Sequence, residues 1–517
     1  MAVWRDIMSY YEQSAPPVRD SRLKMGDSYA GNACDLVNCT REGCLLQQGR
    51  GFWQANSCQM ALSLMMATTV ENSVIVMHAP GGCGALLHSL SVQSAKGKAR
   101  RGKTPAPVPW LTTNLTEADV IGGGERKLRE TIEYADREFR SEIIFVVVTC
   151  APSIIGDDVE EVVRQARSHV SADVVSLHCP GFRSRVVASA YDTFYHGLLR
   201  GLDLTPAPWL DFGPPAPGDP QAELADKKYE YQKSRTVNVW NATSIGSEDE
   251  NEVKRLLSSL GLNVRFFAEY SSRDELRQIS EAGLNVSMCN VHDDYMLKYL
   301  EERFGTPYVI AGMPIGLRHT RSWLLSIAKH FGLEKEANGL ADYEESLVKE
   351  AIEPFTEQVK GKSVLLCGGV VRVGAEATML SELGLKVLSI RAYHYDEGAD
   401  PIYEDVGDVL PDTPVAVSNQ IFEMTHQIKS LKPDLVISHN GTQGYVAKLG
   451  VPSVQLFDAD TAFFGYNGLY RILRRIVFEF KNTSYRERLS QHTRLPYKQS
   501  YFEGDAFRYI KRNKGEV

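Results

Sequence analysis

The feature that most constrains this chain is a series of short apolar runs, rich in valine and isoleucine, that alternate with longer amphipathic stretches. Within each run the apolar residues are consecutive, which is typical of parallel strands covered on both faces. Strands are predicted at 73–79, 142–150, 173–179, 236–242, 264–270, 284–290, 363–369, 386–393, 434–440 and 453–459. Helical patterns such as 157–170 and 322–340 separate them. The alternation predicts an α/β fold with three doubly wound, Rossmann-like parallel sheets.

Two stretches mark boundaries between these units. Residues 205–223 are rich in proline and are typical of a linker, and residues 352–363 precede a new strand. We therefore expect α/β domains at 51–215, 235–355 and 360–480, with irregular arms at 1–50 and 481–517. A length of 517 residues is enough for about three or four domains.

Composition excludes several classes of function. A formal net charge of −8 argues against broad binding to nucleic acids or to anionic membranes. No apolar run reaches the length of a membrane span, and the N-terminus lacks a basic segment followed by an apolar one. The sequence therefore predicts a cytoplasmic protein.

The cysteines lie at informative positions. There are nine, an odd number that makes a poor disulfide framework in a large cytosolic chain. Cys58 begins an expected helix, and Cys83 lies in a glycine-rich turn, "GGCG", directly after a strand. Other cysteines end or nearly end predicted strands, where ligands bind in open α/β sheets: Cys150, Cys179, Cys289 and Cys367. Such thiols could be nucleophiles, metal ligands or unreactive core side chains.

The spacing of the cysteines limits the kinds of metal site that they could form. No CxxC motif and no closely paired histidines are present, so a zinc site is not expected. Widely separated thiolates at strand ends suit a large iron–sulfur cluster, which needs soft ligands from several elements. Cys34, Cys39 and Cys44 match no ferredoxin-type run, and a structural role for them is favoured over a small cluster.

Two further motifs have simple structural explanations. "GGGERK" at 122–127 lacks the ending of a phosphate-binding loop and reads as a helix start. "HDDY" at 292–295 follows Cys289 and is explained as the acidic first turn of a helix.

The motifs together resemble the nitrogenase component family, and its D-type (α) subunit in particular. The resemblance extends in order along nearly the whole chain, through Cys58, 78–84, 112–128, 149–162, 178–184, 284–309, 431–438 and 465–473. The long separation between Cys83 and Cys150 is typical of the D-type subunit rather than of its K-type partner.

The resemblance implies three α/β domains around a metallocluster site. It implies that Cys58, Cys83 and Cys150 hold this subunit's half of an [8Fe-7S] P-cluster shared with a K-type (β) subunit in a heterotetramer. It also implies that Cys289 ligates a large nitrogenase-type iron–sulfur cofactor, whose heterometal stays open, and that a dimeric ATP-dependent iron protein supplies electrons.

Departures from the family pattern bear on the substrate. The cofactor-binding histidine of nitrogenases corresponds to Phe464, and the family's glutamine and histidine that serve the organic acid and the substrate correspond to Val187 and Tyr191. The arginine that the family has after Cys83 corresponds to Ser91. This combination resembles the methylthio-alkane reductases, which cleave C–S bonds to release methanethiol and a hydrocarbon. An E-type scaffold for cofactor assembly and a nitrogenase α subunit are the alternatives.

With Phe464 unable to bind metal, a second protein ligand of the cofactor must lie elsewhere or be absent. His394 follows the strand at 386–393, and its other ring nitrogen could bond Asp396 or Glu397. His439 ends a later strand and is the rival by the same argument. The third possibility is that Cys289 alone holds the cofactor.

Overall fold

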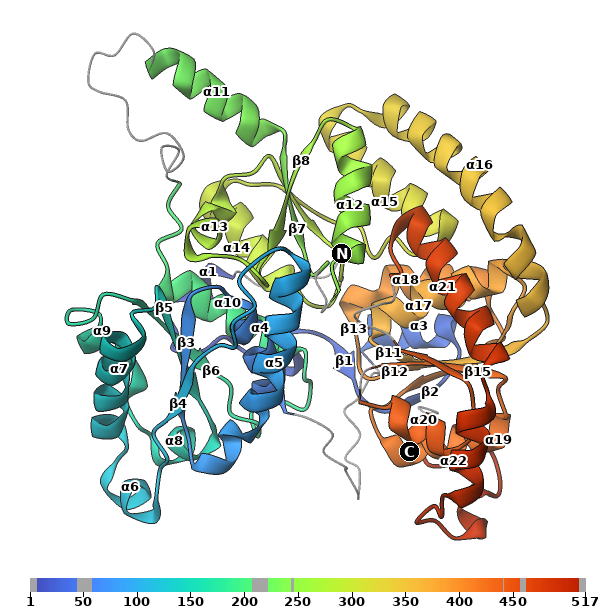
Figure 1. Ribbon diagram of the computed structural model, residues 1–517, viewed down its shortest axis with the longest axis horizontal. Coiled ribbons are helices and arrows are strands. Elements are labelled where there is room, and N and C mark those ends of the chain that lie inside the picture. The colour runs from blue at the N-terminus through green and yellow to red at the C-terminus, as the bar shows by residue number, and fades with distance from the viewer. Residues whose placement is uncertain are drawn as a thin grey trace.

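The computed structural model describes residues 7–43, 58–206, 222–242, 246–439, 441–455 and 462–510. Three sheets, each flanked by helices, make up most of the molecule (Figure 1). Their strands come from 73–178, from 236–310 and, apart from one N-terminal strand, from 363–455. The expected α/β class with parallel sheets is confirmed.

The first sheet has the order β4-β3-β5-β6, with all neighbours parallel. Its strands are β3 (Ser73–His78), β4 (Trp110–Thr112), β5 (Ile143–Val148) and β6 (Asp173–His178). Alternate residues face opposite layers: Phe145 packs with α4 (Gln59–Thr69) and α10 (Ser189–Gly201), whereas Val146 packs with α7 (Glu125–Phe139) and α9 (Val159–Ala166). Burial on both faces explains why the apolar residues run consecutively.

The second sheet has the order β10-β9-β7-β8 and is also wholly parallel. Its strands are β7 (Thr236–Trp240), β8 (Asn263–Phe267), β9 (Leu284–Ser287) and β10 (Tyr308–Ile310). The helices of this region are α12 (Glu248–Ser259), α13 (Arg273–Arg277) and α14 (Asp294–Phe304). The loop from β9 to α14 carries Cys289.

The third sheet has six strands in the order β16-β15-β11-β12-β14-β2. Five of them are parallel: β11 (Ser363–Gly368), β12 (Lys386–Ala392), β14 (Val415–Val417), β15 (Leu435–Ser438) and β16 (Ser453–Gln455). The helices of this region include α15 (Gly316–Phe331), α16 (Glu334–Val359), α17 (Val370–Glu382), α18 (Asp400–Val409), α19 (Ile421–Leu431), α20 (Gln443–Lys448) and α21 (Gly465–Lys481).

The described part of the N-terminal arm is not irregular, which corrects that expectation. It forms α1 (Met8–Tyr11), α2 (Arg19–Arg22), β1 (Met25–Gly26), β2 (Tyr29–Gly31) and α3 (Ala33–Glu42). β2 adds an antiparallel edge to the third sheet, and β1 pairs with β13 (Tyr395–Asp396). These pieces are too short to stand alone, and pairing with the rest of the chain stabilises them.

The C-terminal arm is also partly ordered, with α22 (Ser484–His492) followed by a short turn, η4 (Gln499–Phe502). The remaining elements are α5 (Ala85–Arg100), α6 (Glu117–Gly122), α8 (Cys150–Ile155), α11 (Ala222–Ser234), η1 (Gly81–Gly84), η2 (Gln278–Ser280) and η3 (Glu397–Ala399). Across the part of the chain described here, no helix is both long enough and apolar enough to span a membrane.

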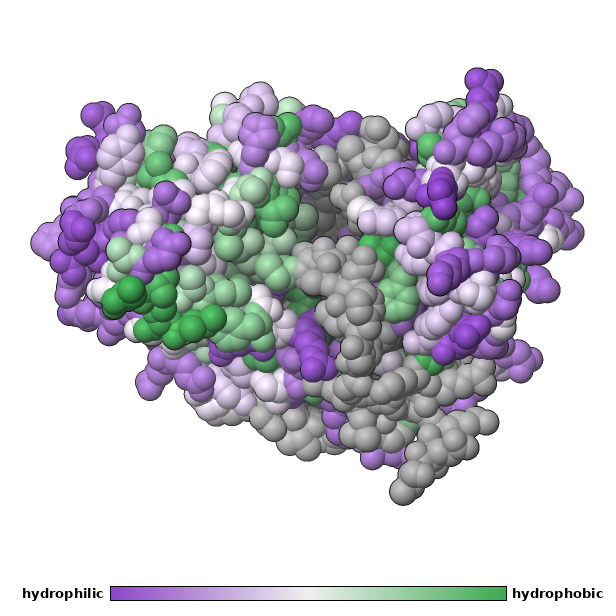
Figure 2. Space-filling view, turned by 90° about the horizontal axis from the view of Figure 1, so that it is seen from below, coloured by the Kyte–Doolittle hydropathy of each residue, from purple (hydrophilic) through white to green (hydrophobic). Residues whose placement is uncertain are grey.

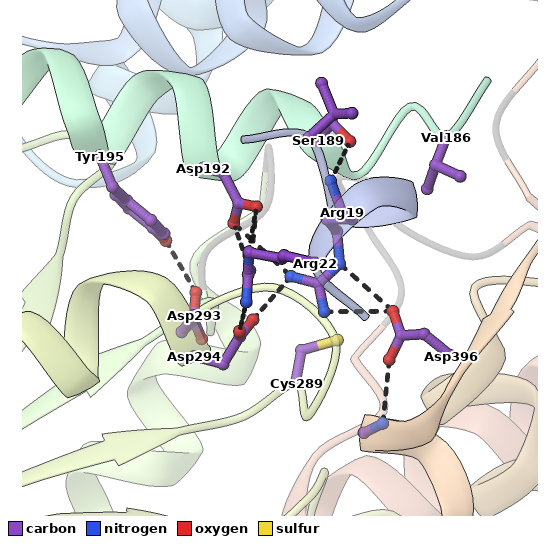
Figure 3. Close-up of polar contacts among 12 residues, drawn as sticks. Arg19, Arg22, Val186, Ser189, Asp192, Tyr195, Cys289, Asp293, Asp294 and Asp396 are labelled. Atoms are coloured by element: carbon purple, nitrogen blue, oxygen red, sulfur yellow. Dashed lines mark hydrogen bonds and ion pairs between the residues drawn. The ribbon is translucent and has the colours of Figure 1, made fainter. Parts of the chain in front are cut away.

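A buried ion-pair junction joins the three sheet regions (Figure 3). Arg19, on α2, lies 2.6 Å from Asp294 and 3.1 Å from Asp396, and Asp192 is 3.6 Å away. Arg22 pairs with Asp192 at 2.9 Å and also contacts Asp294. Because Asp192 follows β6 of the first sheet, Asp294 follows β9 of the second and Asp396 follows β12 of the third, the N-terminal arm links all three regions.

Candidate functional site

Four thiols converge at the carboxyl-terminal edge of the first sheet. Cys83 lies in η1 after β3, Cys150 begins α8 after β5, and Cys179 follows β6. Cys58 precedes α4, whose N-terminal end lies at the same edge. We call Cys58, Cys83, Cys150 and Cys179 the thiol cluster, and each of the first three interacts electrostatically with Cys179.

Gly181 brings the backbone of the "CPGF" turn close to these sulfurs. Its N–H donates to the Cys150 Sγ at 3.1 Å. A Cβ at Gly181 would lie 3.0 Å from the Cys58 Cβ and 3.7 Å from the Cys150 Sγ. The turn therefore requires glycine because of this close approach.

The glycines around Cys83 have more specific neighbours than the sequence indicated. A Cβ at Gly81 would lie 2.9 Å from the Asn114 Oδ1, and one at Gly84 would lie 2.9 Å from the Trp110 ring. Two of the glycines of "GGCG" therefore admit packing from β4 and its following loop, which fixes η1 and with it the direction of the Cys83 side chain.

The electrostatics of the thiol cluster favour a bound metal group. Burial, together with the neighbouring Cys150 and Cys58, raises the pKa of Cys83. Burial likewise raises the pKa of Cys179, whose side chain is fully enclosed. Several thiolates side by side repel one another, and a group of positively charged iron ions would remove that repulsion.

The thiol cluster has features of an iron–sulfur site. Within the described ranges, no three cysteine, histidine or acidic side chains are placed to hold a metal ion. The thiols nevertheless lie around one turn, with a backbone N–H already directed at a sulfur. Cysteine ligands, with hydrogen bonds to sulfur, are the features of an iron–sulfur site.

The thiol cluster lies at the surface, beside exposed apolar side chains. Cys58, Cys83 and Cys150 are partly exposed. Leu86, Ile154 and Phe182 follow three of the cysteines closely and are 44%, 71% and 61% exposed. Figure 2 shows hydrophobic residues gathered on this face, over the part of the molecule that contains the first sheet. Such a patch is typical of a surface that another protein covers.

Cys289 lies in a second, separate place. It is 3% exposed, and its backbone N–H donates to the Ser287 hydroxyl at 3.1 Å. Ser287 in turn donates to Asp293 at 2.6 Å, and Tyr195 donates to the same carboxylate at 2.7 Å. Burial raises the pKa of the Cys289 thiol. Figure 3 shows Cys289 beside the Arg19 junction.

Two histidines and a tyrosine share this place, and we call Cys289, Tyr191, His292 and His394 the Cys289 site. The Tyr191 and His292 rings stack with centroids 3.9 Å apart. Among the described residues, the His292 Nδ1 and the His394 Nε2 have no hydrogen-bond partner, although both atoms are buried. Burial lowers the pKa of His394 to about 4, so its ring is neutral at pH 7. The His394 Nε2 lies 3.9 Å from an Asp396 oxygen, beyond hydrogen-bond distance. Buried nitrogens that make no hydrogen bond beside a thiol fit a bound metal-containing group.

His439 lies elsewhere. Its ring packs on Tyr393 at 5.6 Å, and Tyr393 interacts with Cys367. Cys367 belongs to the core beneath α19, with its sulfur 3.5 Å from that of Met424. His394 instead interacts electrostatically with His292, which shares a turn with Cys289, so His394 is the one of the two predicted histidines that belongs to the Cys289 site.

Phe464 is fully buried at the start of α21. The guanidinium of Arg372 lies over its ring at 5.1 Å, and Asp249 accepts its backbone N–H at 2.9 Å. Glu376, one turn along α17 from Arg372, is buried with no hydrogen-bond partner for either carboxyl oxygen among the described residues. Burial raises the pKa of Glu376 to about 8.

Two other residues that differ from the family pattern have ordinary structural positions. Ser91 donates to the Val108 carbonyl at 3.1 Å, and Val187 lies just before α10. Cys34 is exposed, whereas Cys44 lies outside the described residues.

Several residues of these sites were not predicted. His292 was explained as part of an acidic helix start, although its spacing of three residues from Cys289 was a usable signal. Glu376 was overlooked despite being a single acid in an otherwise apolar stretch of helix. Arg19 gave no signal, because it lies 377 residues from Asp396 in sequence.

A known protein family matches most of this chain. The profile of the "Nitrogenase component 1 type Oxidoreductase" family matches residues 58–481. The nitrogenase molybdenum-iron protein alpha chain of Methanothermobacter marburgensis is 24% identical over 454 residues, 86% of this chain and 89% of that protein. The nitrogenase iron-molybdenum cofactor biosynthesis protein NifE of Klebsiella pneumoniae is 24% identical over 477 residues, 90% of this chain and 97% of that protein.

A solved structure of nitrogenase Cp1 has the same fold, with a TM-score of 0.69 at 19% identity over 88% of this chain and 92% of that one. The family profile covers the thiol cluster, the Cys289 site and Phe464 within one continuous match. The chain therefore belongs to the nitrogenase component 1 type oxidoreductase family.

Proposed function

We propose that this chain is the catalytic subunit of a nitrogenase-like reductase that cleaves C–S bonds, as methylthio-alkane reductases do. The products would be methanethiol and a hydrocarbon. The observation that carries the choice of substrate is Phe464, a fully buried phenyl ring in the place where the family resemblance puts a cofactor-binding histidine. A site altered there is better suited to a substrate other than dinitrogen.

The chain's own residues would hold two groups. Cys58, Cys83 and Cys150 would bind half of an [8Fe-7S] P-cluster, and Cys289 would anchor a large iron–sulfur cofactor. His394 would be the second protein ligand of that cofactor: its Nε2 makes no hydrogen bond among the described residues and lies 3.9 Å from an Asp396 oxygen, whereas the His439 ring packs on Tyr393. When bound, these groups would supply stored electrons and the metal chemistry of bond reduction.

The exposed apolar rim of the thiol cluster supports a shared cluster. Three thiols are too few for eight iron ions, and Leu86, Ile154 and Phe182 need a covering surface. A K-type (β) subunit would supply both in a heterotetramer. The one GxxxxGK[ST] match, at residues 97–104, begins inside helix α5 rather than between a strand and a helix, so it lacks the context of a phosphate-binding loop. ATP hydrolysis would therefore belong to a separate dimeric iron protein.

Around Cys289, the protein excludes water and fixes positions. The Ser287–Asp293 hydrogen bonds hold the loop that carries the thiol, and the Arg19 junction closes it from the N-terminal arm. Reduction of a thioether to a thiol and a hydrocarbon consumes two electrons and two protons. Neutral imidazoles of the Cys289 site are suitable hydrogen-bond donors for such a substrate.

The test is anaerobic purification of this chain with its K-type partner, followed by iron analysis and a headspace assay. With the iron protein, ATP and either dimethyl sulfide or 2-methylthioethanol, we expect methanethiol and the matching hydrocarbon. Production of ammonia from dinitrogen without thiol release would instead identify a nitrogenase and refute the proposal.

A scaffold for cofactor assembly is the second candidate, because the match to NifE covers 97% of that protein. A scaffold would release its cofactor to an acceptor protein lacking it and would not turn over a thioether. Activation of such an acceptor by the purified complex, without methanethiol in the headspace, would favour this role.

A further inference from the structure

His292 is held in the Cys289 site by two contacts. Its backbone N–H donates to the Cys289 carbonyl at 3.2 Å, so the two residues share one turn of the loop from β9 to α14. Its ring is stacked on Tyr191 with an interplanar angle of 15°. Tyr191 lies on α10, which packs on the first sheet, so the orientation of the imidazole is fixed from a different region of the fold.

The His292 Nδ1 is buried and, within the described part of the chain, accepts and donates no hydrogen bond. The two neighbouring carboxylates do not serve it. Asp293 accepts from Ser287, Tyr195 and Asn241. Asp294 is paired with Arg19 and Arg22. A polar nitrogen buried without a hydrogen bond is energetically unfavourable, and its retention calls for a ligand.

The chemistry of the imidazole ring suits donation of a hydrogen bond to a neighbouring acceptor. A neutral imidazole carries one N–H and one lone pair, so it can donate a hydrogen bond without bringing a net charge into the site.

We propose that the His292 Nδ1–H donates a hydrogen bond to a sulfur atom of the iron–sulfur group anchored by Cys289, and that Tyr191 positions the ring for it. The proposal rests on the proposed function, since it needs that group at Cys289. Direct metal ligation by His292 is less suited, because the shared turn keeps it at the same end of the group as the thiolate.

A hydrogen bond to cluster sulfur stabilises the reduced state, because it lowers the negative charge that the sulfur must carry. It therefore raises the reduction potential of the group. His292 would in this way tune the potential at which the Cys289-anchored group accepts electrons.

The test uses the anaerobic complex with its partner subunit and compares His292→Phe, which keeps the stacked ring, with His292→Gln, which keeps an N–H donor. His330→Phe, at an exposed position on α15, is the matched control. The measurements are the reduction potential of the Cys289-anchored group by dye-mediated titration, and its couplings to exchangeable protons by electron–nuclear double resonance after transfer to D2O.

We expect His292→Phe to lose one exchangeable-proton coupling and to shift the potential downward. His292→Gln should retain a coupling and show a smaller shift, and His330→Phe should match the wild type. The signal of the group at the thiol cluster reports whether each variant is folded. An unchanged potential and unchanged couplings in a folded His292→Phe complex would overturn the inference. Absence of any Cys289-anchored signal in the wild type would overturn the proposed function instead.

Discussion

Replacement of Arg19 by methionine is expected to destabilise the protein strongly, because it removes the cation of the buried junction. The Arg19 side chain is 1% exposed. It donates to Asp396 from Nε and Nη2 at 3.2 and 3.1 Å, and to Asp294 at 2.6 Å. Methionine fills similar volume but leaves Asp396 without its cation.

The magnitude follows from these contacts. Hydrogen bonds to charged groups contribute about 1.5–3 kcal/mol each, which would give roughly 4–9 kcal/mol for the three bonds. Arg22 still holds Asp192 and contacts Asp294, so the loss is smaller than the sum. We expect about 3–5 kcal/mol, the usual cost of breaking a buried ion pair from one side.

The assay is thermal unfolding of the wild type, Arg19→Met, Asp396→Asn and the double variant. The single arginine change should lower the Tm by about 3–5 °C, because the unfolding entropy of a chain this long is large. The double variant should recover part of that loss, because a neutral amide replaces the Asp396 carboxylate that would otherwise be buried without its cation. Arg41→Met is the matched control: Arg41 and Glu404 form a pair that is 57% and 47% exposed, so its loss should cost less than about 1 kcal/mol. Equal Tm changes for Arg19→Met and Arg41→Met would refute the reasoning.

Three further outcomes are expected. Glu376 has a pKa of about 8 in the folded protein against an ordinary value of 4.5, so the native state keeps a proton that the unfolded state has lost, and the free energy of unfolding falls by up to about 4 kcal/mol as the pH rises from 5 to 8. Glu376→Gln should flatten this pH dependence in unfolding experiments. An unchanged slope in that variant would show that the Glu376 carboxyl is ionised in the native state. Gly181→Ala should lower the iron content of the thiol cluster, because the added Cβ would lie 3.0 Å from the Cys58 Cβ, whereas Gly82→Ala, with open space around it, should not. A structure of the loaded complex should place a His394 nitrogen within about 2.0–2.3 Å of a metal and His439 outside that range. If neither histidine lies within that distance, Cys289 is the sole protein ligand.

The long strands could be predicted because they are buried on both faces. The run 143–148 is apolar at every position and coincides with β5. The short strands β4, β10 and β14 span three residues each, too few for a recognisable pattern. Their backbone pairing is imposed by longer neighbours, which no local sequence signal records.

The candidate sites could likewise be predicted only in part. The sequence predicts that cysteines at strand ends lie close together, because parallel strands end at one edge of a sheet. The stack of His292 on Tyr191 and the junction at Arg19 could not, because each joins segments about a hundred residues or more apart in sequence, through side-chain packing. Contacts of this kind depend on how separate sheets are placed against one another.

The central claim is that this chain holds two separate iron–sulfur groups, one at the thiol cluster and one at Cys289. Iron analysis and electron paramagnetic resonance of the anaerobic complex test it most directly, on Cys83→Ala, Cys289→Ala and the exposed control Cys34→Ala. The account predicts that Cys83→Ala loses only the signal of the shared cluster, that Cys289→Ala loses only the cofactor signal, and that Cys34→Ala keeps both. Unchanged iron content and an unchanged spectrum in Cys83→Ala would contradict it.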